Sequence, residues 1–193
     1  MKEKEIIQLL LSYLNKVLLE LSNCLSKYPH FYRAKILLKH VIENIVENIE
    51  HDHLVDAIRD LRLILEIIVQ TTYLHMKHRG DQKAIEHELS RREKTASIFN
   101  AKMITDIPGL HGVVKKDILK LYLKLAEYTH PTSKLLEVLT TKDLLKLQEL
   151  ALKTIDYTTY LLLVLCGKNY LDNKLVHEAR KYNLERTSKY LGK

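Results

Sequence analysis

Residues that interrupt helices are scarce in this sequence. Of its 193 residues only five are Gly and three are Pro, and Trp is missing altogether. The strict alternation of apolar and polar residues that marks half-buried strands is also absent. This composition excludes a β-rich or collagen-like chain, and the abundance of Leu, Ile, Lys and Glu indicates an all-α protein.

Cysteine is scarcer still, because Cys24 and Cys166 are the only two. They stand far apart, each within a helical pattern, which differs from the dense cysteine framework of a small secreted domain. We therefore predict two buried free thiols in a reducing compartment.

Targeting and membrane-spanning segments are not recognisable either. The N-terminal stretch mixes acids with bases, lacks a small-residue cleavage site and continues a helical period, so it does not look like a signal peptide. The best apolar run is interrupted by Arg59, Arg62 and Glu66 before it reaches membrane-spanning length. We expect a cytoplasmic protein that does not enter a membrane.

Apolar residues recur at intervals of three and four along most of the chain, as they do on the buried face of a helix. This pattern predicts helices over about 4–27, 30–50, 54–77, 82–100, 113–129, 141–166 and 171–186, with a loop over 105–112. The predicted fold is a single all-α bundle of six or seven mostly antiparallel helices over 1–193. Its bundle would occupy 1–167, and 168–193 would form a basic C-terminal helix.

The helix predicted over 54–77 is the one around which we expect the others to pack. It is apolar on nearly every side, but Arg62, Glu66 and Gln70 are spaced four apart and so form one row along it. A helix that is hydrophobic all round is normally surrounded by others. The polar row should therefore lie at a groove or inside the bundle, where its charges need partners.

Capping residues stand at several predicted helix ends. Asp52 and Asp81 each precede a helix and are predicted to be its N-cap. Gly80 and Gly167 each follow a helix and are predicted to end it.

Arg62 and Glu66 are spaced to form an ion pair along the central helix. One interpretation is a structural pair that fixes the packing of the helix, and the other is a functional site. His130, which follows a helix and precedes Pro131, is the histidine that would complete such a site as an acid or base. A histidine at a helix end also serves as a cap or packing group, so both interpretations of His130 stay open.

Basic residues form a second set of candidates. The formal net charge is +7, and 168–193 supplies +4 of it through seven bases and three acids. Other bases gather on two of the predicted helices: Arg91, Arg92, Lys115, Lys116, Lys120 and Lys124. They form either the solvated faces of amphipathic helices or a nucleic-acid-binding stripe that tracks phosphates toward His130.

Ten histidines raise the question of a metal site. The closest pairs, His51 with His53 and His75 with His78, have no second pair at a spacing familiar from zinc sites. Glycine-rich phosphate loops and nucleophile elbows are also absent. We therefore predict neither a metal nor a cofactor.

One combination of motifs carries a resemblance. The central helix has Arg62, Glu66 and then Tyr73-Leu74, and it is followed by Tyr-x-x-Leu-Ala-x-Tyr-x-His-Pro-Thr over 122–132. Together these motifs resemble prokaryotic all-helical families that are similar to HEPN-type bundles, over about 54–165. A Ser commonly stands in that pattern where this chain has Ala126.

The resemblance implies a helical bundle, often dimeric, and in many HEPN domains a metal-independent RNA endonuclease. Those domains use an Arg and a following His with four to six residues between them. Here only Arg33 and His40 fit that spacing, and they lie on a different predicted helix from the residues that carry the resemblance. An equivalent pair would therefore have to form in space, between Arg62 and His130.

Two functional hypotheses follow from the sequence. The first is an HEPN-like protein that binds RNA and acts as an endonuclease of a defence or toxin-type system, with Arg62, Glu66 and His130 as its catalytic residues. The alternative is a non-catalytic helical scaffold that forms a homodimer or binds a partner protein through its apolar faces.

Overall fold

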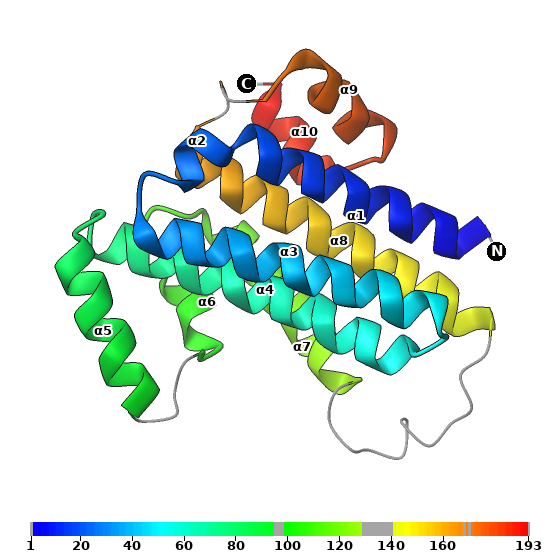
Figure 1. The fold of residues 1–193 in the computed structure, drawn as a ribbon, viewed down its shortest axis with the longest axis horizontal. Coiled ribbons are helices and arrows are strands. Elements are labelled where there is room, and N and C mark those ends of the chain that lie inside the picture. The colour runs from blue at the N-terminus through cyan, green and yellow to red at the C-terminus, as the bar shows by residue number, and fades with distance from the viewer. Residues whose placement is uncertain (1, 95–98, 129–140, 168, 170, 193) are drawn as a thin grey trace.

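The structure is a computed structural model that describes residues 2–94, 99–128, 141–167, 169 and 171–192. Over these residues the chain forms ten α-helices and no strand, which confirms the predicted all-α class. None of the helices in this part of the chain is both long and apolar enough to cross a membrane. In chain order they are α1 (Lys2–Glu20), α2 (Ser22–Leu25), α3 (Pro29–Glu50), α4 (Leu54–Lys77), α5 (Gln82–Lys94), α6 (Lys102–Asp106), α7 (Gly112–Glu127), α8 (Thr141–Cys166), α9 (Asn173–Lys181) and α10 (Glu185–Leu191) (Figure 1).

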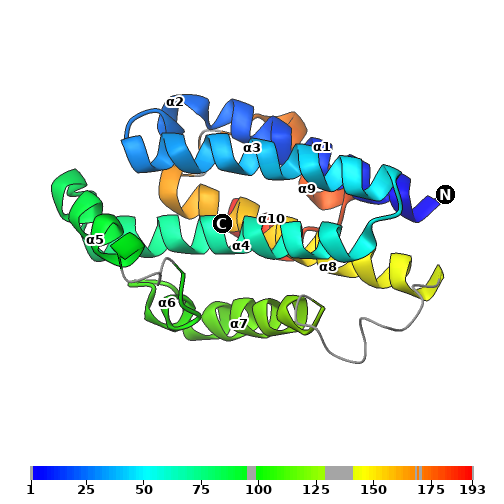
Figure 2. The same cartoon turned by 60° about the horizontal axis from the view of Figure 1, so that its bottom comes forward.

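α4 lies in the middle of the molecule, as predicted. It packs against α3, α6, α7 and α8, and α1 packs on α3 and α8. Figure 2 shows the resulting layers, with α1 and α3 on one side of α4 and α8, and α6 and α7 on the other. Ile64, Leu65 and Ile68 of α4 are fully buried between these neighbours.

Three of the four predicted capping residues stand at helix ends. The Asp81 carboxylate accepts hydrogen bonds from the backbone N–H groups of Lys83 and Ala84 at 3.0 and 3.3 Å, so it caps α5. Gly80 and Gly167 follow α4 and α8 with φ of +78° and +92°, the left-handed conformation that glycine adopts readily.

The prediction that Asp52 caps α4 was wrong. Asp52 has a φ of +60°, and its carboxylate forms an ion pair with Lys4 of α1 at 2.6 Å. The N-cap position is taken by His53, which makes no side-chain capping hydrogen bond. The Asp52 carboxylate therefore pairs with α1, although the local sequence pattern predicts that it caps α4.

Three predicted segments are divided differently in the structure. The segment 4–27 contains a break at Leu21, between α1 and α2. α6 begins before the predicted loop 105–112 and enters it. The Asn100 side chain accepts a hydrogen bond from Lys102 N at 2.8 Å, an Asx-turn that directly precedes the helix. The predicted C-terminal helix is two helices, α9 and α10, separated near Asn183, whose φ is +56°.

The prediction of two free thiols was also wrong. Cys24 of α2 and Cys166, the last residue of α8, form a disulfide with their Cα atoms 5.7 Å apart. Figure 1 shows that α2 lies beside the end of α8, although the two cysteines are 142 positions apart in the sequence. Only the tertiary packing of α1, α3 and α8 brings them together.

Reduction of this disulfide is expected to lower the free energy of unfolding by roughly 3–5 kcal/mol, because the bond closes a long loop and restricts the unfolded chain. Urea denaturation with and without dithiothreitol measures the change. The control is the Cys24→Ser/Cys166→Ser variant, whose midpoint should not respond to the reductant. If the wild type has the same midpoint in both conditions, the disulfide does not stabilise the fold.

Candidate functional site

Arg62, Glu66 and Tyr122 form a hydrogen-bonded network between α4 and α7. Arg62 Nε donates to Glu66 Oε1 at 2.8 Å, and Arg62 Nη2 donates to the Tyr122 hydroxyl at 2.8 Å. The side chains of Arg62 and Glu66 are 23% and 21% exposed, so the pair lies at the edge of the bundle rather than in its core. Phe99 covers the ring of Tyr122, with the two ring centroids 5.2 Å apart.

This network holds its groups in fixed protonation states. Burial, and then the carboxylate of Glu66, raise the pKa of Tyr122, so the phenol stays protonated at neutral pH. The charge of Arg62 is offset by Glu66 at the same place. His130, the third residue of the predicted catalytic site, lies outside the described residues, so the three-residue site stays a prediction.

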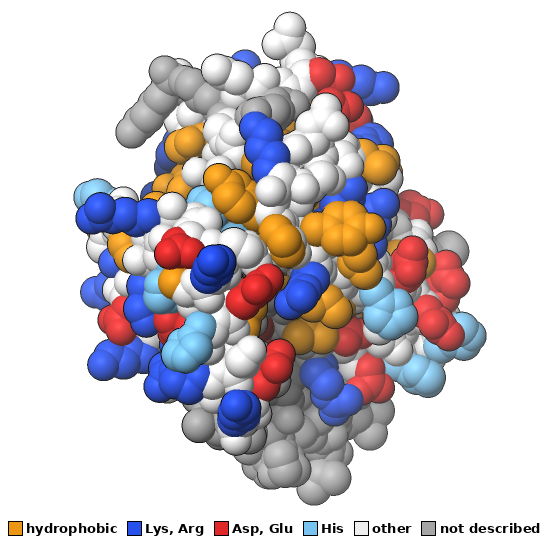
Figure 3. All heavy atoms as spheres, turned by 60° about the vertical axis from the view of Figure 1, so that its left-hand side comes forward, with side chains coloured by type: hydrophobic (Ala, Val, Ile, Leu, Met, Phe, Trp, Pro, Cys, Tyr) orange, Lys and Arg blue, Asp and Glu red, His pale blue; other side chains and the backbone are white. Residues whose placement is uncertain are grey.

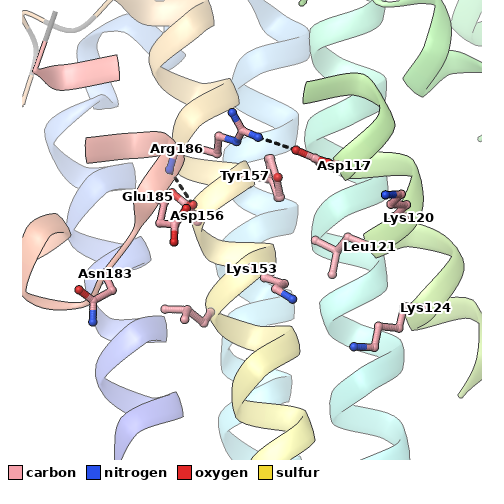
Figure 4. Close-up of a pocket in the computed structure, with 11 residues that line it drawn as sticks. Asp117, Lys120, Leu121, Lys124, Lys153, Asp156, Tyr157, Asn183, Glu185 and Arg186 are labelled. Carbon is pink, nitrogen blue, oxygen red and sulfur yellow. Dashed lines mark hydrogen bonds and ion pairs between the residues drawn. The ribbon is translucent and has the colours of Figure 1, made fainter. Parts of the chain in front are cut away.

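A cleft lies between α7, α8 and α10, with a volume of about 380 Å³. Figure 4 shows Lys120 and Lys124 on its α7 side and Lys153 on its α8 side, with Lys124 and Lys153 directed into the space between the two helices. Its complete lining is Asp117, Lys120, Leu121, Lys124, Leu152, Lys153, Asp156, Tyr157, Asn183, Glu185 and Arg186. We call it the α7–α8 cleft.

The lysines of the α7–α8 cleft share a single carboxylate. Glu149 accepts from Lys153 at 2.6 Å and lies 3.5 Å from Lys124. Lys120 forms no hydrogen bond or ion pair with any other residue that the structure describes. Three positive charges therefore face one negative charge along this side of the cleft.

Two of the three acidic residues at the other end of the cleft hold α10, whereas the exposed Glu185 pairs with Lys189 of its own helix at 3.7 Å. The guanidinium of Arg186 donates to Asp117 of α7. Asp156 of α8 accepts from the backbone N–H groups of Arg186 and Thr187, each at 2.9 Å. Burial raises the pKa of Asp156, although these two amides act in the opposite direction.

Tyr122, the partner of Arg62, and the lysines of the cleft lie on different faces of α7. Tyr122 reaches α4, whereas Lys120 and Lys124 line the cleft with α8. Positions 120 and 122 are about 200° apart around a helix, which explains the separation. Lys115 donates to the backbone oxygen of Thr105 at 3.0 Å, and the exposed Lys116 lies outside the cleft lining.

Arg91 and Arg92, the other predicted RNA contacts, lie on α5 and outside the cleft. Arg92 donates to the buried carboxylate of Glu88 through Nε and Nη2, at 3.0 and 2.6 Å. Lys77 and His78 at the end of α4 bind the same carboxylate at 2.8 and 2.6 Å. Burial alone would raise the pKa of Glu88, but these hydrogen bonds outweigh it and lower the pKa to about 2.

The sequence prediction missed Lys153, Arg186 and the acids that hold α10. A local signal existed for Asp156, since it is the one acid in the otherwise apolar and hydroxyl-rich segment 154–166. Lys153 and Arg186 carry no such signal, because each follows a helical pattern of ordinary solvent-exposed residues. Both side chains line one cleft only because α10 packs against α8.

Metal-ligating side chains do not converge in the part of the chain that the structure describes. No three of its His, Cys, Asp and Glu side chains are grouped so that they could hold an ion.

Replacing Glu66 by Ala is expected to lower the free energy of unfolding by about 1–3 kcal/mol, because the half-buried guanidinium of Arg62 loses its carboxylate. The matched control is Glu149→Ala, since Glu149 and Lys153 form the same type of i,i+4 pair with both side chains about half exposed. An exposed pair contributes about 0.2–1 kcal/mol. Equal losses of stability in urea denaturation would show that the Arg62 pair behaves as a surface pair.

The Glu88 cluster predicts a pH dependence. Because the folded-state pKa of about 2 is below the ordinary 4.5, ionised Glu88 stabilises the folded protein above about pH 4.5, and this contribution is lost as the pH falls from 4.5 toward 2. Its size is about 3 kcal/mol. Glu88→Gln should therefore be less stable at neutral pH and should lose less stability on acidification. Glu93→Gln, at an exposed position of the same helix, should follow the wild type in thermal melts across this range.

Comparisons of the chain with known proteins leave the resemblance to HEPN-type bundles as a prediction. No family model, no curated protein and no solved structure matches the chain.

Proposed function

We propose that this protein binds RNA through its phosphate backbone at the α7–α8 cleft. The observation that carries the proposal is the convergence of Lys120, Lys124 and Lys153 from two helices, with Glu149 as their one acidic partner. Lysines that neutralise phosphates supply most of the affinity of non-specific nucleic-acid binding. Two of these lysines belong to the row that the sequence marks as a candidate RNA contact.

The walls of the cleft suit a nucleotide better than an isolated ion. Leu121 and Leu152 provide apolar surface beside the lysines, and the volume of about 380 Å³ is of the size that small-ligand sites have. Arg186 and Asp117 close one end of the cleft as an ion pair. A phosphate beside the lysines and a ribose or base against the leucines would use both kinds of surface.

The catalytic part of the proposal is an RNA endonuclease of a defence or toxin-type system, in which Arg62 and Glu66 act with His130. His130 would exchange a proton with the ribose 2′-hydroxyl or the leaving oxygen, and Arg62 would steady the phosphate. The network with Tyr122, which fixes the guanidinium in place, supports this role for Arg62. Because this network and the cleft lie on different faces of α7, binding and cleavage are separable by mutation.

With RNA as the ligand, we propose the cytoplasm as the site of action. Cys24 and Cys166 form a disulfide, so free thiols do not point to a reducing compartment. This localisation therefore follows only from where the proposed ligand occurs.

The Lys120→Ala/Lys124→Ala/Lys153→Ala variant is expected to bind single-stranded RNA at least about tenfold more weakly at low salt. It should also reduce the slope of log affinity against log salt concentration by about 2, because three phosphate contacts are lost. Fluorescence anisotropy of a labelled RNA measures both quantities. The matched control is Lys2→Ala/Lys83→Ala/Lys174→Ala, which removes three exposed charges outside the cleft and should keep most of the affinity.

Cleavage is tested in the same samples with an end-labelled RNA and no added metal. Loss of cleavage in His130→Ala, with binding retained, would support the endonuclease. Binding without cleavage by the wild type would leave an RNA-binding protein. No binding at low salt would reject the proposal and favour the alternative of a homodimeric or partner-binding scaffold, for which Tyr32 and Ile36 on α3, each about half exposed, are the first residues to replace.

A further inference from the structure

A second pocket lies at the end of the molecule where α4, α8 and the segment between α6 and α7 meet. Its volume is about 420 Å³, and it is lined by His75, Met76, Arg79, Pro108, Gly109, Val164 and Leu165. We call it the His75 pocket. Figure 3 views this end of the protein and shows hydrophobic side chains gathered in the middle of the face, with acidic, basic and histidine side chains around them.

His75 is the first member of a chain of hydrogen bonds that leads away from the pocket. Its Nδ1 lies 3.3 Å from Nε2 of the buried His30, and Nδ1 of His30 lies 2.9 Å from Oε1 of Gln82. The amide nitrogen of Gln82 donates to Glu86 at 2.8 Å. Phe31 packs on the His75 ring, with the two centroids 4.6 Å apart, and holds it in this orientation.

The carboxylate at the end of the chain sets the direction of every hydrogen bond in it. Ionised Glu86 can only accept, so Gln82 must present its NH₂ group to Glu86 and its oxygen to His30. His30 therefore carries its proton on Nδ1 and accepts at Nε2. His75 must then donate from Nδ1.

This direction leaves Nε2 of His75 as an unprotonated acceptor. Burial lowers the pKa of both His75 and His30, so the two rings are neutral at physiological pH. Nε2 of His75 has no hydrogen-bond partner among the residues that the structure describes. The pocket thus contains an acceptor whose tautomer the protein has fixed.

Arg79 supplies the second polar group of the pocket. It has a φ of +52° directly after the end of α4, a position that usually holds Gly or Asn because other L-residues adopt this conformation only at a free-energy cost. Gly80, which follows, also has a positive φ, and a Cβ there would lie 3.1 Å from His75 Cε1. An arginine at the strained position therefore brings a guanidinium to the pocket where a glycine would serve the turn better.

We propose that the His75 pocket binds a small α-hydroxy carboxylic acid with an apolar side chain. Arg79 pairs with the carboxylate of such an acid, and Nε2 of His75 accepts a hydrogen bond from its hydroxyl. Both side chains line this one pocket, so a ligand that carries its carboxylate and hydroxyl on neighbouring carbons can contact both. Met76, Pro108 and Leu165 then contact the apolar side chain.

The proposal is tested with mandelate as the probe, by following the His75 ring protons in NMR titrations of the full chain. Mandelate is expected to give a saturable shift. Phenylacetate, which lacks the hydroxyl, should bind about five- to tenfold more weakly, because His75 then has no donor to accept from. Phenylethanediol, which lacks the carboxylate, should also bind at least about tenfold more weakly.

Arg79→Gly provides the decisive variant. It should lose mandelate binding by at least about tenfold and should raise the melting temperature by about 2–4 °C, because glycine relieves the positive φ. Arg79→Asn, which also tolerates this conformation, is the second variant and should give the same loss of binding. The absence of a saturable shift in the wild type, or wild-type binding by either variant, would overturn the proposal.

Discussion

The burial of α4 on most sides is the constraint on which the rest of the structure depends. Because α3, α6, α7 and α8 all pack against it, each polar group that α4 buries must find its partner on a neighbouring helix or on α4 itself. Arg62 does so with Tyr122 of α7 and with Glu66. Lys77 and His78 do so with Glu88 of α5. The polar contacts of α4 therefore connect it to the helices that cover it.

These contacts also explain how α5 is held. This helix buries Ile85 completely but is otherwise rich in charge, so its apolar contribution is small. Glu88 is buried with three basic partners, Arg92 of α5, Lys77 of α4 and His78 directly after α4, and their attraction exceeds the penalty of removing the carboxylate from water. A single cluster of charges thus holds α5 on the bundle, whereas the longer helices are held by an apolar stripe.

The sequence predicts well where the helices lie along the chain, but it predicts poorly which residues of different helices contact one another. Periodicity places the cores of α3, α4, α7 and α8, and the spacing of Arg62 and Glu66 predicts their ion pair, because both depend on residues of one helix. The disulfide, the partner of Asp52 and the lysines of the α7–α8 cleft each join residues from different helices. Periodicity within one helix carries no information about which helix will lie opposite.

The two candidate sites differ in ways that match their proposed ligands. The α7–α8 cleft is built from long, exposed lysines that adapt to a flexible polymer, and its charges are offset by only one carboxylate on that side. The His75 pocket has one arginine and a histidine whose tautomer is fixed through three further residues, so it can distinguish the donors and acceptors of a small molecule. Leu165 in its wall directly precedes Cys166. The disulfide therefore ties one wall of this pocket to α2, a covalent link next to the small site.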